Sequence, residues 1–182
     1  MLMKYRVSRL RGFTLLEVMI ALVVLSVGLL GIVKLESAAI ASTTVAAKRS
    51  LAALEGDSLA AMMHVNRGYW SSPDASGGKI AITGTTVTVT AVAPNLTTSV
   101  AGTTACTMTA TPYCSVTDMA AYDLKQWAAA VNMVLPNYTA TIACGNPVSC
   151  TINITWSEKA VAVNVTQTSA TTNPSYSLYV EP

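Results

Sequence analysis

The chain has 182 residues, which is enough for a domain with its own hydrophobic core. Hydrophobic residues make up 52% of it, charged residues only 11%, and the formal net charge is +2. Four of the 11 basic residues lie among the first twelve positions, which leaves seven basic and nine acidic residues in the rest of the chain. A nucleic-acid surface needs clustered lysine and arginine. The composition therefore argues against nucleic acid as a partner.

Residues 13–33 form an apolar run in which the only charged residue is Glu17. As a helix rising about 1.5 Å per residue, this run would be roughly 31 Å long, which matches a bilayer hydrocarbon core of about 30 Å. The basic residues that precede it predict a cytoplasmic leader, with everything after Val33 on the far side of the membrane.

Three interpretations of this run compete: a plain membrane anchor, a cleaved secretory signal, or a helix in which Glu17 has a function. Ala39-Ile40-Ala41 supplies a signal-peptidase pattern, but the apolar part of a secretory signal has only about 7–15 residues. A carboxylate at the centre of a spanning helix costs about 2.5–3.5 kcal/mol, and less near the interface. No basic residue follows Glu17 before Lys34. The partner of Glu17 is therefore expected to be another chain, water, or a charge created nearby.

Cleavage of the chain between Gly12 and Phe13 would create such a charge, because Phe13 would then carry a free amine. That amine, placed beside the Glu17 carboxylate of an adjacent copy, would neutralise both charges in an apolar setting. It would also fix the axial register of neighbouring chains.

The stretch RGFTLLEVMIALVVLSVGLLG resembles the N-terminal motif of type IV pilins: a short basic leader ending in glycine, then Phe-Thr-Leu-Leu-Glu at the start of a long apolar helix. The resemblance implies cleavage after Gly12 by a prepilin peptidase and N-methylation of Phe13. It also implies that Glu17 contacts the amino terminus of a neighbouring subunit during assembly.

The helical pattern continues beyond the membrane segment, from Lys34 to about Val65, without a proline. Its apolar positions predict one stripe that packs on a globular head: Leu51, Leu54, Ser58, Met62 and Val65. The charged residues of this half are expected to lie largely in water: Lys48, Arg49, Glu55 and Asp57. Arg67-Gly68 and the Ser-Ser-Pro that follows at 71–73 are expected to end the helix.

Beyond Pro73 the composition changes to threonine, valine, serine and glycine, and the apolar residues alternate with period two. Four segments are interpreted as parts of an antiparallel sheet. Two contain a turn, 79–93 (at Gly84) and the hairpin 138–156, and two are single strands, 160–168 and 176–182. A second helix is predicted over residues 117–135, capped by Thr117 and stopped by Pro136. Trp127 and Trp156 are interpreted as core residues.

Four cysteines form two local pairs, Cys106 with Cys114 and Cys144 with Cys150. An even number of cysteines beyond a membrane segment indicates disulfides in an oxidising compartment. Sequential pairing is favoured because each bridge closes a short loop. A zinc site is disfavoured, because the spacings are not those of CxxC knuckles and the one histidine, His64, is distant. No catalytic or nucleotide-binding motif is present, so we expect neither an enzyme nor a cofactor.

The later motifs CSVTDMAAYDLKQWAAAVNMVLPNYTATI, ITW and YVEP resemble those of PilV-type minor pilins, also called type IV pilus modification proteins. The resemblance implies the α+β pilin fold: a long N-terminal helix packed on a small antiparallel β-sheet head with a short additional helix. Its parts would be a leader (1–12), an assembly half-helix in the inner membrane (13–33), a periplasmic half-helix (34–66) and a β-rich head (67–182).

The role implied is assembly or priming of a pilus near its tip, and the implied final location is the cell surface. The implied partners are prepilin peptidase, other minor and major pilins, a tip adhesin, and inner-membrane lipid before assembly. The alternatives are a minor pseudopilin of a type II secretion system, a permanently anchored periplasmic binding domain, and a domain released after Ala41.

Overall fold

The structure is a computed structural model that describes residues 12–90, 94–102, 106, 114–145, 149–159 and 171–182. It divides into two units, one ending at Ser42 and the other beginning at Thr43. The elements in chain order are α1 (Leu15–Val65), α2 (Arg67–Trp70), β1 (Lys79–Thr83), β2 (Thr86–Thr90), α3 (Pro94–Ala101), α4 (Val116–Val134), β3 (Thr139–Gly145), β4 (Ser149–Thr155), β5 (Glu158–Lys159), β6 (Thr171–Thr172) and β7 (Ser175–Val180).

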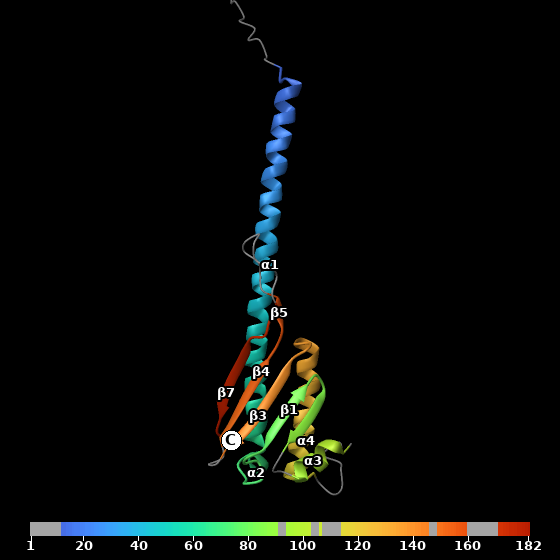
Figure 1. The fold of residues 1–182 in the computed structure, drawn as a ribbon, viewed down its shortest axis with the longest axis vertical. Helices are drawn as coiled ribbons and strands as arrows, with labels where there is room; N and C mark the ends of the chain where they lie inside the picture. Colours follow the sequence, from blue (N-terminus) through green and yellow to red (C-terminus); the bar gives the residue numbers. More distant parts are fainter. Residues whose placement is uncertain (1–11, 91–93, 103–105, 107–113, 146–148, 160–170) are drawn as a thin grey trace, which may run out of the picture. The chain divides into compact units, whose positions relative to one another are not determined.

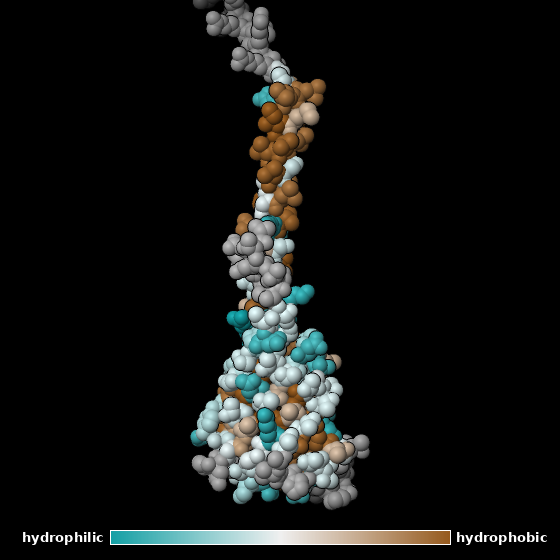
Figure 2. Space-filling view, in the orientation of Figure 1, coloured by the Kyte–Doolittle hydropathy of each residue, from teal (hydrophilic) through white to brown (hydrophobic). Residues whose placement is uncertain are grey.

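The long helix α1 has 51 residues, so the single helix expected across both halves of the N-terminal region is present (Figure 1). In the first unit its large apolar side chains are all exposed, from Phe13 to Ile40. Figure 2 shows hydrophobic residues dominating the surface of this segment. No other described residues of the first unit therefore pack against the apolar surface of this segment.

The second unit is built on a five-stranded antiparallel sheet in the order β2-β1-β3-β4-β7. The register places apolar residues opposite one another on one face, as in the row Ile80, Ile142, Ile152 and Leu178. The alternate residues, mostly threonine and serine, lie on the other face. The period-two pattern of the sequence thus gives a sheet with one buried face, and the expected α+β class is confirmed.

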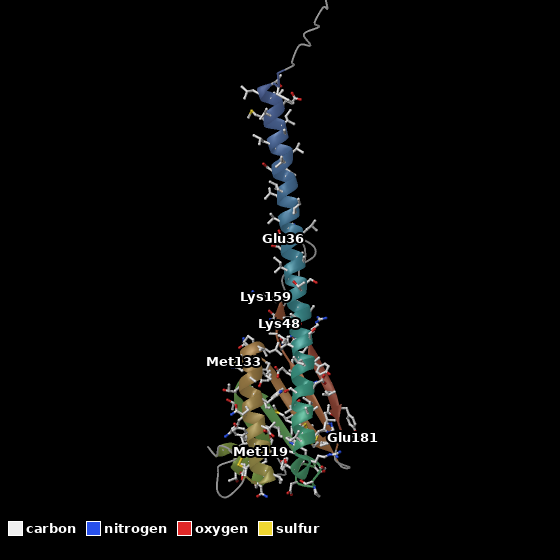
Figure 3. All side chains as sticks on the ribbon, turned by 180° about the vertical axis from the view of Figure 1, so that it is seen from behind. Glu36, Lys48, Met119, Met133, Lys159 and Glu181 are labelled. Carbon is white, nitrogen blue, oxygen red and sulfur yellow. A yellow bond between two sulfur atoms is a disulfide. The ribbon has the colours of Figure 1, made fainter. Side chains whose placement is uncertain are left out.

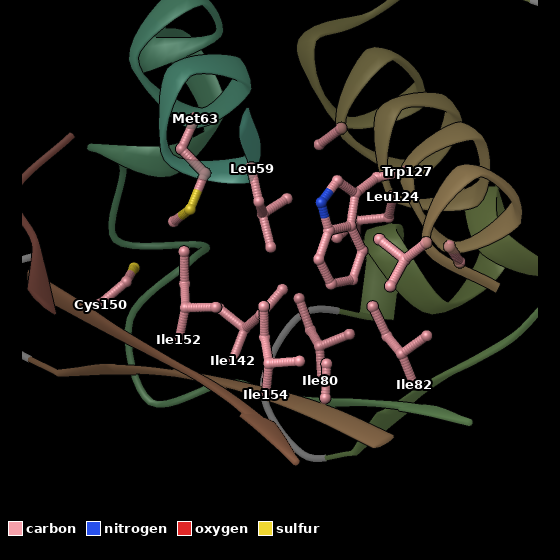
Figure 4. Packing of buried hydrophobic residues seen from close by; sticks show 14 of the residues in the cluster. Leu59, Met63, Ile80, Ile82, Leu124, Trp127, Ile142, Cys150, Ile152 and Ile154 are labelled. Carbon is pink, nitrogen blue, oxygen red and sulfur yellow. The ribbon is translucent and has the colours of Figure 1, made fainter. Parts of the chain in front are cut away.

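The buried face of the sheet packs against α4 and the second half of α1 (Figure 4). Leu59 and Met63 come from α1, and Leu124 and Trp127 come from α4. The Trp127 ring contacts Tyr138 edge to face at 5.9 Å, and its Nε1–H donates to the Glu55 carbonyl oxygen at 2.9 Å. Both tryptophans interpreted as core residues, Trp127 and Trp156, are buried.

The predicted packing stripe of α1 was wrong in register. The fully buried residues of α1 are Ala52, Gly56, Leu59 and Met63, whereas Leu54 is 62% exposed and Val65 is 88% exposed. The buried positions of α1 include a glycine, because the helix and the strands approach closely at Gly56. A Cβ built on Gly56 would come within 3.8 Å of Ile154 Cδ1.

The ends of the helices also differ from the prediction. Ser115, rather than Thr117, caps α4, and Thr117 lies inside the helix. The break after α1 falls at Asn66, whose Nδ2–H donates to the Val116 carbonyl oxygen at 2.8 Å, and the chain then forms α2. The helix α3 was not predicted. The strand expected over residues 160–168 lies entirely outside the described residues. On either side of that range, β5 and β6 pair with each other.

Candidate functional site

The Gly12-Phe13 junction lies just ahead of α1 and is open on all sides. Gly12 is exposed and no atom would lie within 4 Å of a Cβ built on it. Phe13 is 83% exposed. A peptide bond between two exposed residues is sterically accessible to a protease.

Thr14 starts the helix that follows this junction. Its Oγ1 accepts a hydrogen bond from the Glu17 backbone N–H at 3.3 Å, and its carbonyl oxygen accepts from Glu17 N at 3.1 Å and Val18 N at 3.3 Å. A threonine at this position with a glutamate three residues later is the sequence pattern of a capping box. The Thr14 side chain therefore has a local role at the start of the helix, as an acceptor for the Glu17 backbone N–H.

Glu17 lies in the first turn of α1, where a carboxylate is favoured by the helix dipole. It shares one face of the helix with apolar side chains that line a shallow hollow: Phe13, Val18, Ala21, Leu22 and Leu25. Among the described residues, no cation forms an ion pair with Glu17. Phe13 and Glu17 thus border the same hollow at the start of the helix.

The helix that carries this motif meets the length and composition of a membrane span. An 18-residue window within α1 has a mean hydropathy of 2.6, and none of that window is buried. The motif therefore lies at the start of a helix that fits membrane anchoring.

The head holds two disulfides, Cys106–Cys114 and Cys144–Cys150. Cys144 and Cys150 face each other across the β3–β4 hairpin and are both buried. Cys114 lies directly before the residue that caps α4. Among the described residues, no group of histidine, cysteine and acidic side chains could hold a metal ion.

A charged contact between α1 and β5 was missed by sequence reasoning. The Arg49 side chain is 61% exposed, as expected. It nevertheless donates from Nη2 to Glu158 Oε2 at 3.1 Å and from Nε to Oε1 at 3.4 Å. The Nε1–H of Trp156 donates to Glu158 Oε1 at 2.8 Å, and Lys48 Nζ donates to the Ser157 carbonyl oxygen at 3.3 Å.

This cluster holds β5 against α1 around a carboxylate that is only 3% exposed. Burial acts to raise the pKa of Glu158, but the hydrogen bonds from Arg49 and Trp156, together with the positive charges of Arg49 and Lys48, outweigh it, so that the pKa is lowered. The one indication in the sequence was the adjacent basic pair Lys48-Arg49. Such a pair is equally expected on a helix face that is simply exposed to solvent, so it did not predict the ion pair.

Residues 8–33 match the family model of the prokaryotic N-terminal methylation motif. Neither the curated proteins nor the solved structures include a significant match to the chain. The methylation motif implies processing by a prepilin peptidase and assembly with other pilins. Together with the α+β fold, it supports a protein of the type IV pilin or pseudopilin type, anchored in the inner membrane.

Proposed function

We propose that the protein is a minor pilin of a type IV pilus, closest to the PilV type, that acts in assembly or priming of the filament near its tip. The observation that carries the proposal is the Gly12-Phe13 junction, with Glu17 in the first turn of a long helix whose first half is apolar and exposed. The role is structural, in keeping with the motif.

In this proposal residues 1–12 are a cytoplasmic leader, 13–33 the membrane and assembly segment, 34–66 the periplasmic half of the helix, and 67–182 the head. Cleavage after Gly12 gives Phe13 a free amine, which is then N-methylated. The apolar half-helix leaves lipid for a bundle of similar helices, so its surface stays out of water throughout. The two disulfides support an oxidising compartment for the head.

The first test is the mass of the intact protein and of its N-terminal peptide after extraction from membranes. We expect a chain that starts at N-methylated Phe13. An intact leader in cells with active prepilin peptidase would leave only an anchored periplasmic domain. A start at Ser42 would identify a secretory signal instead.

A minor pseudopilin of a type II secretion system remains the second candidate, because the same motif and fold serve both systems. Deletion of the protein separates them. We expect loss of surface pili with protein export intact, and the opposite result would assign the protein to secretion.

A further inference from the structure

The two edges of the five-stranded sheet differ in what lies beside them. At one edge, α3 and α4 pack near β2. At the other edge, β7 pairs with β4 alone, and Figure 1 shows no described helix or strand beyond it. In the part of the chain that the structure describes, β7 is therefore bordered by a strand on one side only.

The register of the sheet shows which backbone groups of β7 point outward. Residues that face each other in an antiparallel pair alternate between hydrogen-bonded and non-bonded pairs. Just before β7, the Trp156 N–H donates to the Pro174 carbonyl oxygen at 3.2 Å, so this pair is a bonded one. The register of β4 and β7 continues the alternation, and the even-numbered residues of β7 therefore bond to β4. The N–H and C=O groups of Ser175, Ser177 and Tyr179 consequently point away from the sheet.

The strand β7 lacks the features that usually protect an open edge. Soluble proteins make edge strands very short, interrupt them with a bulge, or place lysine or proline on them. β7 has six residues, contains neither lysine nor proline, and pairs with β4 in a continuous register. Its outward backbone groups are spaced to pair with another strand, as in complexes where an extended segment joins a sheet edge.

The side chains of β7 define the pattern of a strand that would fit beside it. Tyr176 and Leu178 pack against the core but remain half-buried at the edge. Ser175, Ser177 and Tyr179 lie on the opposite face and are exposed. An added strand with aliphatic residues at alternate positions would cover Tyr176 and Leu178 and keep its polar residues in water. A helix could cover the same side chains, but it would not pair with the outward backbone groups.

The two ends of β7 carry opposite charge. Glu181 directly follows the strand and is exposed. Near the start of β7, beyond the end of β4, three cations outnumber the one carboxylate of Glu158: Lys48, Arg49 and Lys159. Figure 3 shows Lys48 and Lys159 at the upper end of the head and Glu181 at the lower end. A strand antiparallel to β7 would meet opposite charge at both ends if it began with a basic residue and ended with an acidic one.

We propose that the open edge of β7 receives an extended segment of a partner protein, which adds a sixth strand antiparallel to β7. Its backbone pairs with the outward groups of Ser177 and Tyr179. Its aliphatic side chains cover Tyr176 and Leu178, and a lysine or arginine near its N-terminal end pairs with Glu181. The proposal goes beyond a role in the pilus and depends neither on leader cleavage nor on filament assembly.

The probe is a fluorescent peptide, blocked at both ends, with the sequence Lys-Val-Thr-Val-Thr-Val-Thr-Glu. The reference is the same peptide with lysine and glutamate exchanged. The full chain is held in lipid nanodiscs, and empty nanodiscs measure binding to lipid. We expect the first peptide to bind about 5-fold more tightly, because two weak attractions replace two weak repulsions. Glu181→Gln reduces this preference. Equal binding, tighter binding of the exchanged peptide, or binding no stronger than to empty nanodiscs contradicts the proposal.

A change in the peptide backbone separates strand pairing from adsorption of an apolar peptide. In the proposed register, the N–H of the middle threonine faces β7 and the N–H of the valine before it faces solvent. N-methylation of that threonine should therefore remove measurable binding, whereas N-methylation of the valine should leave binding intact. Equal effects of the two modifications would overturn the proposal.

A matched pair of substitutions at Ser177 tests the protein side of the contact. Ser177→Pro removes an outward N–H but none of the bonds from β7 to β4, and edge strands accept proline at such positions. We expect it to abolish peptide binding. Ser177→Ala also loses the hydrogen bond that Asn153 Nδ2 donates to the hydroxyl at 2.7 Å, but it keeps the N–H and should bind the peptide normally.

Circular dichroism establishes that both Ser177 variants are folded, and the N-methylated peptides decide the question if Ser177→Pro is not. Undiminished binding to a folded Ser177→Pro protein contradicts the proposal. A dimer of the unmodified protein that Ser177→Pro abolishes would make a second copy the occupant and would also overturn it.

Discussion

Gly56 of α1 and Tyr176 of β7 lie in direct contact across the head. A Cβ built on Gly56 would lie 2.8 Å from Tyr176 Cε1 and 3.3 Å from Cδ1. Glycine in a helix interior costs about 1 kcal/mol relative to alanine, so its position here needs a reason. The missing side chain lets the tyrosine ring of the edge strand rest on the helix.

Gly56→Ala is expected to destabilise the protein by roughly 1 kcal/mol, because overpacking costs about 1–3 kcal/mol and exceeds the gain in helix propensity. The measurement is urea unfolding of the detergent-solubilised chain, followed by tryptophan near-UV circular dichroism. In a Tyr176→Ala background the same change should stabilise by about 1 kcal/mol, since the clash is gone. An equal effect in both backgrounds would contradict the contact as the cause.

The Glu158 carboxylate joins β5 to α1, and its removal is expected to leave a buried donor behind. Glu158→Leu deprives the Trp156 Nε1–H of its acceptor, and a buried unpaired donor costs about 1–3 kcal/mol. Glu158→Gln keeps an acceptor for Trp156 but loses the ion pair with Arg49, so it should be the milder change. Urea unfolding at pH 7 checks the order of the two variants.

The pH dependence of stability should reflect protonation of the Glu158 carboxylate. Burial raises the folded-state pKa of Glu158, but the hydrogen bonds from Arg49 and Trp156 and the charges of Arg49 and Lys48 lower it further, so that it lies below the ordinary value of 4.5. The unfolded chain therefore binds this proton more readily. The contribution of Glu158 is therefore complete above the unfolded pKa and is lost as the pH falls through the folded pKa. We expect the difference in unfolding free energy between the unmodified protein and Glu158→Gln to shrink below about pH 4.5. A difference that stays constant across that range would exclude this linkage.

The capping box at the start of α4 predicts unequal effects for two substitutions of one residue. Ser115 Oγ accepts from Asp118 N at 3.1 Å, and Asp118 Oδ2 accepts from Ser115 N at 3.4 Å. Ser115→Ala should cost about 1 kcal/mol, whereas Ser115→Gly should cost only a few tenths. Thermal unfolding of both variants tests this, and Thr117→Ala serves as a control that leaves the cap intact. Equal losses of stability for alanine and glycine would mean that the Ser115 cap contributes little to the free energy of unfolding.

Much of the fold could be predicted from the sequence because its strongest patterns are local. The apolar run that begins at Phe13 and the alternation in the strands depend only on near neighbours, and both the long helix and the hairpins were found. The helix cap was placed two residues late, because Ser115 and Thr117 are both good capping residues and local propensity does not separate them.

The errors in α1 have a different origin. A helix with alanine on several sides offers more than one apolar stripe, and the choice depends on how closely the sheet approaches. Gly56 faces the strands because a Cβ at this position would clash with the Tyr176 ring. The side chains that impose this limit, Tyr176 and Ile154, lie about a hundred positions further along the chain. The pairing of Arg49 with Glu158 is non-local in the same way. Sequence patterns over short windows cannot show either contact.

Glu17 provides the prediction that bears most directly on assembly. Glu17→Gln should leave membrane insertion and cleavage after Gly12 intact, because the glutamine still fits at the start of the helix and the junction is unchanged. It should impair incorporation beside a neighbouring subunit, since the N-terminal amine of that subunit would lose its charged partner. A charge-assisted hydrogen bond of about 1.5–3 kcal/mol corresponds to roughly a 10- to 150-fold loss of association.

Co-purification with partner pilins measures this loss. Glu36→Gln, which changes an exposed carboxylate of α1 outside the 13–33 segment, is the matched control. If the Glu17→Gln protein co-purifies as well as the control while remaining correctly processed, the carboxylate does not pair with the amine, and its contribution is limited to that of a negative charge in the first turn of the helix.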